Sequence, residues 1–343
     1  MPTNYSAWVA VRKGHPADAI QLKTDLTIPT KLAKDHVLVK VLATALNPVG
    51  YKLLGFLPNF LAGRPHVMEQ DVAGVIVDPN GSEFSTGDKV FGVSGSTTNG
   101  TLAQYVVLPA ARLATMPPNI SAVEAAGLAT VIVTANQALR DLHVESGQTV
   151  FVNGGSSAVG LSAIQIAKSM GCKVVATASG RNKDLLLGSG VDEFIDYTQA
   201  PLVEQLKSNP PSPKFHAIFD AVGLTDPVLY LNSALYLAPG GKYVTAGTLP
   251  KTRKEFSGML RQVFEGFLRP TWLGGVQRGY GAVTIKFEKK ELETARDLVT
   301  KGAVKPIVDS VHPFDRDGVM RAYEKLMSKH AAGKVVIKVA DEE

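Results

Sequence analysis

The sequence predicts an α/β protein in which a β-rich region precedes a doubly wound parallel sheet. Short strands broken by Gly, Pro and Asn dominate the chain up to residue 122. From residue 149 onward, β-branched strands alternate with helical patterns at a spacing typical of a parallel sheet covered by helices on both faces. A length of 343 residues is enough for two domains with a core in each.

The β-rich region contains four runs with the apolar pattern of strands. They are Val37–Ala43, Val72–Val77, Asp88–Gly92 and Leu102–Leu108. Near the C-terminus, a helical pattern from Arg316 to Lys329 precedes a strand-like run, Gly333–Val339. The C-terminal part therefore adds a helix and a strand to the expected fold.

A glycine-rich turn follows the first strand of the α/β region. The apolar run Thr149–Val152 stops at Gly154 and Gly155, and an amphipathic helical pattern starts near Ser157. Such a strand, turn and helix direct backbone N–H groups and the positive helix end at one point, where a pyrophosphate can bind. The spacing is Gly155-x-Ser157-x-x-Gly160, so serine replaces the middle glycine of the dinucleotide fingerprint. The residues expected at the pyrophosphate are Gly155, Ser156, Ser157, Ala158 and Val159.

The end of the next strand, Cys172–Ala178, predicts which dinucleotide binds. Folds that bind NAD usually place Asp or Glu there to hold the ribose 2′-hydroxyl. This chain has Ser179 instead, followed by Arg181, Asn182 and Lys183. A carboxylate would repel a 2′-phosphate, whereas a hydroxyl and two cations attract it, so we expect NADPH as the cofactor. The alternative is that Arg181 and Lys183 are solvated charges at the start of a helix.

The alternation of strands and helices continues to residue 287. The expected strands are Phe194–Tyr197, Ala217–Gly223, Lys242–Thr248 and Val283–Phe287. The expected helices are Asn182–Gly188, Pro201–Lys207 and Pro227–Leu237. The stretch Leu249–Gly281 either lines a substrate pocket with its aromatic residues or contains an amphipathic surface helix, Glu255–Phe267. Ligands bind at the carboxyl ends of parallel strands, so the residues there are expected beside the cofactor. They are Tyr197, Val222, Gly223 and Gly247. Asp220 lies at the same edge, but an Asp at the end of a strand often only caps a turn.

The composition is that of an ordinary globular protein and excludes several classes of function. Hydrophobic residues make up 45% of the chain and charged residues 20%, and no apolar run reaches the ~18 residues that span a membrane. The net charge of +5 is scattered, whereas a nucleic-acid partner would require a clustered basic stripe. The first residues lack a signal-peptide pattern, and a single cysteine, Cys172, suits a reducing compartment. We therefore expect a cytoplasmic protein with neither a membrane nor a nucleic-acid partner.

Four segments resemble those of one superfamily over nearly the whole chain. Leu46–Lys52 is similar to an N-P-x-D-x-K segment, Asp71–Val77 to D-x-A-G-x-V, and Phe84–Val90 to F-x-x-G-D-x-V. Val133–Leu139 is similar to the helix that precedes the nucleotide fold in the same proteins. Together they resemble the zinc-independent medium-chain dehydrogenase/reductases, best in the quinone oxidoreductase and enoyl reductase branch. Within it, the trans-acting enoyl reductases of fungi look nearest.

This resemblance implies both the domains and the reaction. It implies a GroES-like catalytic domain of residues 1–122 and 288–343 and a Rossmann domain of residues 123–287. The implied reaction is reduction of a double bond activated by a thioester or ketone carbonyl. Hydride goes to the β-carbon, an enolate forms, and a proton is then delivered.

The chain departs from its zinc-dependent relatives at the metal site. Those relatives have a cysteine where Asn47 stands and a histidine near Gln70, so the sequence predicts no metal here. His66 and Glu69 are expected to be surface residues rather than ligands. The family's aspartate at position 50 is Gly50 here, which is expected to loosen a structural hydrogen bond of the Asn47 loop.

Four residues are candidates for catalysis by resemblance. Lys52 and Thr134 match positions implicated in enoyl reductases, and Tyr51 and Asn47 are neighbouring candidates. Lys52 can stabilise an enolate oxygen as a cation, and Thr134 can donate a hydroxyl hydrogen bond. The alternatives are a solvated lysine at a loop end and a threonine that bonds its own helix backbone.

Three functions stay open on the sequence alone. The first is an NADPH-dependent enoyl reductase, the second an NADPH:quinone oxidoreductase, and the third an NADPH-binding protein without relevant turnover. The substrate would be a small molecule or a carrier-bound enoyl group or quinone. The resemblance also implies a polyketide synthase as partner and a monomer or homodimer as the oligomeric state.

Overall fold

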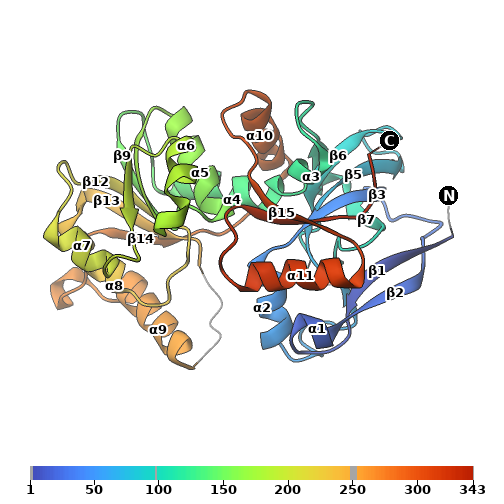
Figure 1. The fold of residues 1–343 in the computed structure, drawn as a ribbon, viewed down its shortest axis with the longest axis horizontal. Coiled ribbons are helices and arrows are strands. Elements are labelled where there is room, and N and C mark those ends of the chain that lie inside the picture. Colours follow the sequence, from blue (N-terminus) through green and yellow to red (C-terminus); the bar gives the residue numbers. More distant parts are fainter. Residues whose placement is uncertain (1–2, 97–98, 248–252, 343) are drawn as a thin grey trace. The chain divides into compact units, whose positions relative to one another are not determined.

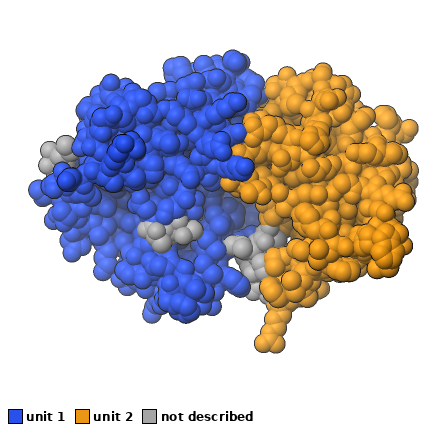
Figure 2. Space-filling model, turned by 180° about the vertical axis from the view of Figure 1, so that it is seen from behind, with its two compact units in different colours: residues 1–133, 286–343 blue, residues 134–285 orange. Residues whose placement is uncertain are grey.

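The structure is a computed structural model that describes residues 3–96, 99–247 and 253–342. Contacts divide the chain into two compact units, drawn in blue and orange in Figure 2. Unit 1 comprises residues 1–133 and 286–343, and unit 2 comprises residues 134–285. Helix α4 (Leu128–Asp141) begins in unit 1 and ends in unit 2. The domain boundaries that the sequence predicts after residues 122 and 287 stay predictions.

Unit 2 contains a six-stranded parallel sheet in the order β11-β10-β9-β12-β13-β14. In chain order this is 3-2-1-4-5-6, the order of a doubly wound dinucleotide-binding sheet. The predicted α/β class is therefore confirmed. The strands are β9 (Thr149–Asn153), β10 (Lys173–Ala178), β11 (Glu193–Asp196), β12 (Phe215–Asp220), β13 (Leu237–Thr245) and β14 (Gly279–Ala282). Four of these strands, β9, β12, β13 and β14, are labelled in Figure 1.

Helices cover both faces of this sheet, with α5 and α6 on one side and α7 and α8 on the other (Figure 1). Successive side chains of a strand point to opposite faces of the sheet, so each face has its own core. On one face, Phe151 and Ile218 pack in a buried cluster with Leu206 of α7 and Leu229 of α8. The helices are α5 (Ala158–Ser169), α6 (Lys183–Gly188), α7 (Leu202–Ser208), α8 (Val228–Leu231) and α9 (Arg253–Val263). Shorter helical turns are η2 (Gly180–Asn182), η3 (Ser233–Leu235), the π-helix η4 (Phe264–Leu268) and η5 (Thr271–Leu273).

Two predicted elements of unit 2 are wrong. The edge strand is Gly279–Ala282 rather than Val283–Phe287, because Tyr280 stacks on Tyr243 of the neighbouring strand with ring centroids 5.6 Å apart. The helix predicted over Pro227–Leu237 shortens to α8 and η3, since Leu237 already belongs to β13. Strand β13 ends at Thr245, and Thr248, the predicted last residue of that strand, lies outside the described residues.

Unit 1 contains two sheets. The smaller has the order β2-β1-β4, and the larger the order β15-β16-β3-β5-β6-β8, with β7 paired to β3. The strands of the smaller sheet are β1 (Asn4–Ala10), β2 (Ile20–Thr27) and β4 (His66–Val67). Those of the larger sheet are β3 (His36–Ala45), β5 (Asp71–Asp78), β6 (Lys89–Val93), β7 (Tyr105–Pro109), β8 (Leu113–Thr115), β15 (Val308–Pro313) and β16 (Lys334–Lys338).

The helices of unit 1 lie on these sheets, and several begin at a residue that suits a helix start. Pro48 occupies the first position of α2, and Ser121 and Glu124 form a capping box at the start of α3. A buried cluster joins Trp8 of β1, Tyr51 of α2 and Tyr323 of α11. The helices are α1 (Pro16–Ala19), α2 (Pro48–Phe56), α3 (Ala122–Ala125), α10 (Lys289–Thr300) and α11 (Arg316–Met327), with one turn, η1 (Ala110–Arg112). In the part of the chain that the structure describes, no helix is long and apolar enough to cross a membrane.

Candidate functional site

The turn between β9 and α5 has the geometry of a phosphate-binding loop. Gly154 has a φ of 78°, and a Cβ added to Gly160 would lie 2.3 Å from the carbonyl oxygen of Gly154. Glycine at both positions therefore allows the strand to turn tightly into the helix. Ser157 is the N-cap of α5: its hydroxyl donates to the Gly154 carbonyl at 2.8 Å and accepts from the Gly160 N–H at 3.0 Å. The serine that replaces the fingerprint glycine thus holds the turn together.

Two substitutions of Ser157 test whether its role is to cap the helix. We expect Ser157→Ala to lower the free energy of unfolding of unit 2 by about 1 kcal/mol and to weaken dinucleotide binding, because the cap is lost. Ser157→Gly, which restores the usual fingerprint, is expected to cost only a few tenths of a kcal/mol. Thermal unfolding and dinucleotide titration of the two variants check this. Equal losses in both variants would contradict the capping role.

A second turn, after β10, brings together the residues that the sequence predicts at a ribose 2′-phosphate. Ser179 is the N-cap of η2, and Asn182 donates from its side chain to the Ser179 hydroxyl at 3.4 Å. Arg181 and Lys183 are exposed. Sequence reasoning missed Asp196 at the end of the neighbouring strand β11. Its carboxylate lies against this turn, because a Cβ added to Gly180 would be 2.6 Å from one of its oxygens. Thr198 and Gln199 donate to this carboxylate and hold it in place.

The other predicted cofactor residues lie at the same edge of the sheet. All strands of unit 2 are parallel, so the turns that follow β9, β10, β11, β12 and β13 emerge side by side. These turns carry the predicted residues Ser156, Tyr197, Val222, Gly223 and Gly247, and the first turn of α5 carries Ala158 and Val159. Tyr197 and Val222 are half exposed, which leaves their side chains accessible to a ligand.

Buried polar side chains join four neighbouring strands just beneath these turns. Asn153 of β9 donates to Asp220 of β12 at 2.9 Å and accepts from Thr177 of β10 at 2.9 Å. Thr177 in turn accepts from the Gly154 N–H at 2.9 Å, and Thr245 of β13 donates to Asp220 at 3.2 Å. Asp220 also caps its own turn by accepting from the Leu224 N–H, and burial raises the pKa of its carboxyl group. Asp220 therefore caps a turn, as one of its two interpretations predicts, and it also joins β12 to β9 and β13.

Three of the predicted catalytic residues belong to the start of α2 in unit 1. Asn47 is its N-cap residue and is buried, whereas Lys52 is partly exposed. Tyr51 is buried in the cluster with Trp8 and Tyr323, which favours a packing role. The fourth, Thr134, is a buried residue of α4 and lies in unit 2.

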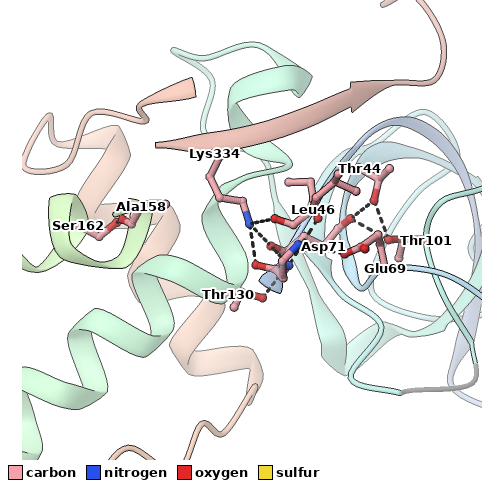
Figure 3. Close-up of polar contacts among 11 residues, drawn as sticks. Thr44, Leu46, Glu69, Asp71, Thr101, Thr130, Ala158, Ser162 and Lys334 are labelled. Atoms are coloured by element: carbon pink, nitrogen blue, oxygen red, sulfur yellow. Dashed lines mark hydrogen bonds and ion pairs between the residues drawn. The ribbon is translucent and has the colours of Figure 1, made fainter. Parts of the chain in front are cut away.

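A network of hydrogen bonds surrounds the buried ion pair between Lys334 and Asp71 (Figure 3), and Asn47 belongs to it. Lys334 of β16 contacts the Asp71 carboxylate at 3.0 Å and donates to the Asn47 side-chain oxygen at 2.8 Å. The Asn47 amide nitrogen donates to the same carboxylate at 2.9 Å, and Thr130 donates to its other oxygen. Both ends of the Asn47 side chain are therefore occupied within the protein.

Glu69 is a second functional candidate that sequence reasoning missed. It was expected at the surface, but it is 6% exposed and adopts a φ of 64°, a conformation that is strained for a residue other than glycine. Burial raises the pKa of its carboxyl group to about 7, although hydrogen bonds from Tyr323 and the Asn47 N–H oppose the shift. The feature of the sequence that could have pointed to Glu69 is Gly50, which replaces the family's aspartate. A Cβ at position 50 would lie 2.6 Å from a Glu69 carboxylate oxygen.

The donor set around Asn47 does not fit zinc. Zinc sites in proteins use thiolates, imidazoles and carboxylates in tetrahedral array. Asn47 and Gln70 offer only amides, Asp71 is engaged by Lys334, and the single cysteine of the chain, Cys172, lies in unit 2. Within residues 3–96, 99–247 and 253–342, no three His, Cys, Asp or Glu side chains group together as a metal site.

Two protein-family models match the chain. Residues 33–118 match the alcohol dehydrogenase GroES-like domain, and residues 189–337 match the zinc-binding dehydrogenase domain. The first match confirms the GroES-like character predicted for the β-rich part. The second carries the name of a metal that the residues around Asn47 do not fit.

Relatives and solved structures agree with these matches. The chain is 33% identical to the trans-enoyl reductase pgmF of Aspergillus terreus, across 99% of this chain and 97% of that protein. It is 31% identical to the chloroplastic NADPH-dependent alkenal/one oxidoreductase of Arabidopsis thaliana, across 98% of this chain and 80% of that protein. The quinone oxidoreductase of Coxiella burnetii shares the fold, with a TM-score of 0.80 at 24% identity, across 98% of this chain and 99% of that one. The chain thus belongs to the medium-chain dehydrogenase/reductases, oxidoreductases with a GroES-like and a nucleotide-binding domain, in the branch that holds the trans-enoyl reductases.

Proposed function

We propose that this protein is an NADPH-dependent reductase of carbon–carbon double bonds conjugated to a carbonyl group, in an enoyl thioester or an enone. One observation carries the proposal. Two relatives that match at least 98% of the chain are named for enoyl reduction and for alkenal/one oxidoreduction. The turns at the sheet edge of unit 2 support the proposed cofactor, and the residues of α2 support the proposed reduction.

The residues at the carboxyl edge of the unit 2 sheet would hold NADPH. The β9–α5 turn presents backbone N–H groups and a helix N-terminus to the pyrophosphate. Ser179, Arg181, Asn182 and Lys183 would contact the 2′-phosphate through a hydroxyl, an amide and two cations. When bound, the nicotinamide supplies a hydride to the β-carbon of the substrate.

Lys52 and Thr134 would act on the substrate carbonyl. As hydride reaches the β-carbon, negative charge develops on the carbonyl oxygen, and a cation or a hydroxyl donor at that oxygen stabilises the enolate. The reaction ends when a proton reaches the α-carbon. Asn47 and Tyr51 would assist by holding the first turn of α2, since the Asn47 side chain is bonded within the protein and Tyr51 is buried.

The preference for NADPH predicts a selective loss. We expect Arg181→Ala to weaken NADPH binding by ~1.5–3 kcal/mol, the value of a charge-assisted contact, and to leave NADH binding nearly unchanged. Asp196→Asn is the opposite test, because the Asp196 carboxylate lies beside Gly180 of the same turn. Removing its charge is expected to tighten NADPH binding. Titration with both dinucleotides checks this, and a comparable loss for both in Arg181→Ala would refute the 2′-phosphate contact.

A side-by-side assay tests the proposed reaction. NADPH oxidation by the purified protein is measured with a short 2-enoyl thioester, an enone and an ortho-quinone. Preference for the thioester or enone supports the proposal. Preference for the quinone favours NADPH:quinone oxidoreduction, and NADPH binding without oxidation favours the protein without relevant turnover.

The biological setting follows from the same proposal. A carrier-bound enoyl substrate and a polyketide synthase as partner suit a chain that is similar to a trans-enoyl reductase. We propose a cytoplasmic protein, a monomer or a homodimer, with the catalytic domain at residues 1–122 and 288–343 and the Rossmann domain at residues 123–287.

A further inference from the structure

Helix α2, which carries Lys52, is held at both ends by one short segment. This segment, Arg64–Glu69, includes strand β4 and follows the helix in the chain. At the N-terminal end of α2, the Asn47 N–H donates to the Glu69 carboxylate at 3.0 Å. At the C-terminal end, the Arg64 guanidinium donates to the carbonyl oxygens of the last turn. These bonds run to Leu53 at 3.1 Å, Leu54 at 3.0 Å and Leu57 at 2.8 Å.

The two charges suit the helix electrically. The N-terminus of a helix carries unpaired N–H groups and partial positive charge, and the C-terminus carries unpaired carbonyl groups and partial negative charge. A carboxylate at the N-terminal end and a guanidinium group at the C-terminal end therefore stabilise the helix and bond to its free backbone groups. Proteins usually obtain this effect from capping residues within the helix, yet Asn47 forms no side-chain cap to α2. Glu69, in the loop between β4 and β5, accepts the Asn47 N–H instead.

The absence of a side chain at position 50 makes room for this arrangement. A Cβ on Gly50 would stand 2.6 Å from one Glu69 carboxylate oxygen, which Tyr323 of α11 also holds by a 2.8 Å hydrogen bond. The sequence predicted that loss of the family's aspartate at this position would loosen the Asn47 loop. Instead, the Glu69 carboxylate occupies that space and bonds the loop.

We propose that Arg64 and Glu69 are positioning residues that clamp α2 from both ends and thereby fix Lys52 for the reaction. The inference rests on the proposed function for its effect on catalysis, but the clamp itself concerns the rigidity of α2 and can be measured without substrate.

Protonation adds a dependence on pH to the clamp. Burial raises the pKa of the Glu69 carboxyl group to about 7, and the ionised form is the stronger acceptor for the Asn47 N–H. The charged and titratable groups around it are Tyr323 on α11, Lys334 on β16, Asp71 on β5, and Arg64 and His66, which line the same small cavity. The clamp is therefore expected to weaken as the pH falls through 7. His66 is the group to control for, because an imidazole can titrate in the same range.

Three variants test the clamp: Glu69→Gln, Arg64→Met and Gly50→Ala. We expect amide hydrogen exchange in residues 47–57 to accelerate and the kcat for enone reduction to fall, each by roughly tenfold, the value of one charge-assisted bond. The dissociation constant of NADPH, measured on the same variants, is expected to stay unchanged. Arg64→Lys, which keeps a cation at the helix end, should recover part of the loss. Fluorescence of the buried Trp8 verifies that unit 1 is folded in each variant.

Gly50→Ala gives the sharpest contrast. Alanine normally strengthens a helix relative to glycine, so without a clamp α2 would become more rigid. With the clamp, the added Cβ displaces the Glu69 carboxylate and α2 loosens. Matched controls are Glu204→Gln on α7, which pairs with Lys207 of its own helix, and Arg316→Met in the first turn of α11, because both side chains are exposed.

The pH profile gives an independent readout. The wild-type kcat is expected to fall several-fold from pH 8 to pH 6 with a midpoint near 7, in His66→Asn as well, while Glu69→Gln keeps a low and flat value. The clamp is overturned if wild-type exchange rates and kcat persist in Glu69→Gln, or if Gly50→Ala slows exchange in α2. If the wild type reduces no enone or thioester but the exchange rates change as expected, the proposed function fails and the clamp stands.

Discussion

Lys334→Met is expected to destabilise unit 1 by about 3–5 kcal/mol, the cost of leaving one member of a buried ion pair without its partner. The Lys334 side chain is 7% exposed and that of Asp71 is fully buried, so water cannot replace the lost ammonium group. The substitution also removes the hydrogen bonds to the Asn47 side chain and the Leu46 carbonyl. The uncharged donors that remain, Asn47 and Thr130, cannot neutralise the Asp71 carboxylate.

Denaturant unfolding followed by tryptophan fluorescence measures this loss in unit 1. The chain has two tryptophans: Trp8 is buried in unit 1, whereas Trp272 is 82% exposed and changes little on unfolding. The control is the double variant Lys334→Met/Asp71→Asn, which removes both charges and should regain most of the stability. A loss below about 1 kcal/mol in the single variant would show that the pair is solvated, as surface pairs are.

Lys52→Met is expected to lower the kcat for reduction of an enoyl thioester by on the order of 100-fold to 1,000-fold, the usual effect of removing one donor to a developing oxyanion. Quinone reduction should be nearly unaffected, because it needs little acid catalysis. Steady-state kinetics with both acceptors on the same preparation provide the comparison. An equal loss of activity with both acceptors would contradict a catalytic role for Lys52 and indicate a structural one.

Thr134→Val is the companion variant. Valine keeps the shape of threonine, so the buried packing on α4 is preserved while the hydroxyl is lost. If Thr134 donates to the substrate carbonyl, enoyl reduction falls and quinone reduction does not. If its hydroxyl bonds only its own helix backbone, both activities persist.

The parallel sheet of unit 2 could be predicted because its information is local. A β-branched run followed by glycines and an amphipathic helix identifies the first strand–turn–helix unit, the alternation of strand and helix patterns identifies those after it, and parallel pairing places the turns at one edge. The edge strand was misplaced because its register depends on Tyr280 packing against Tyr243 and Tyr230, contacts between residues far apart in the chain.

The site in unit 1 could be predicted only in part, because its contacts are long-range. The motifs identified Asn47 and Lys52, but the partners of Asn47 come from Asp71 and Lys334, and nothing in the spacing of these residues links them. Glu69 was misjudged for the same reason. A carboxylate three residues after His66 was expected to be solvated, but Glu69 is buried and bonded to Tyr323, 254 residues further along the chain.

The order in which the chain is synthesised matters for unit 1, because strand β16 lies inside its larger sheet. Residues 336–338 pair with Ala43–Ala45 of β3, and Lys334 of the same strand neutralises Asp71. The ribosome releases the N-terminal part first, so β3 and Asp71 emerge long before the strand that pairs with them. Unit 2, by contrast, is one continuous stretch of residues 134–285. During translation, the later unit can therefore finish folding first, while the earlier one waits with an open strand edge and an uncompensated carboxylate until its last segment leaves the tunnel.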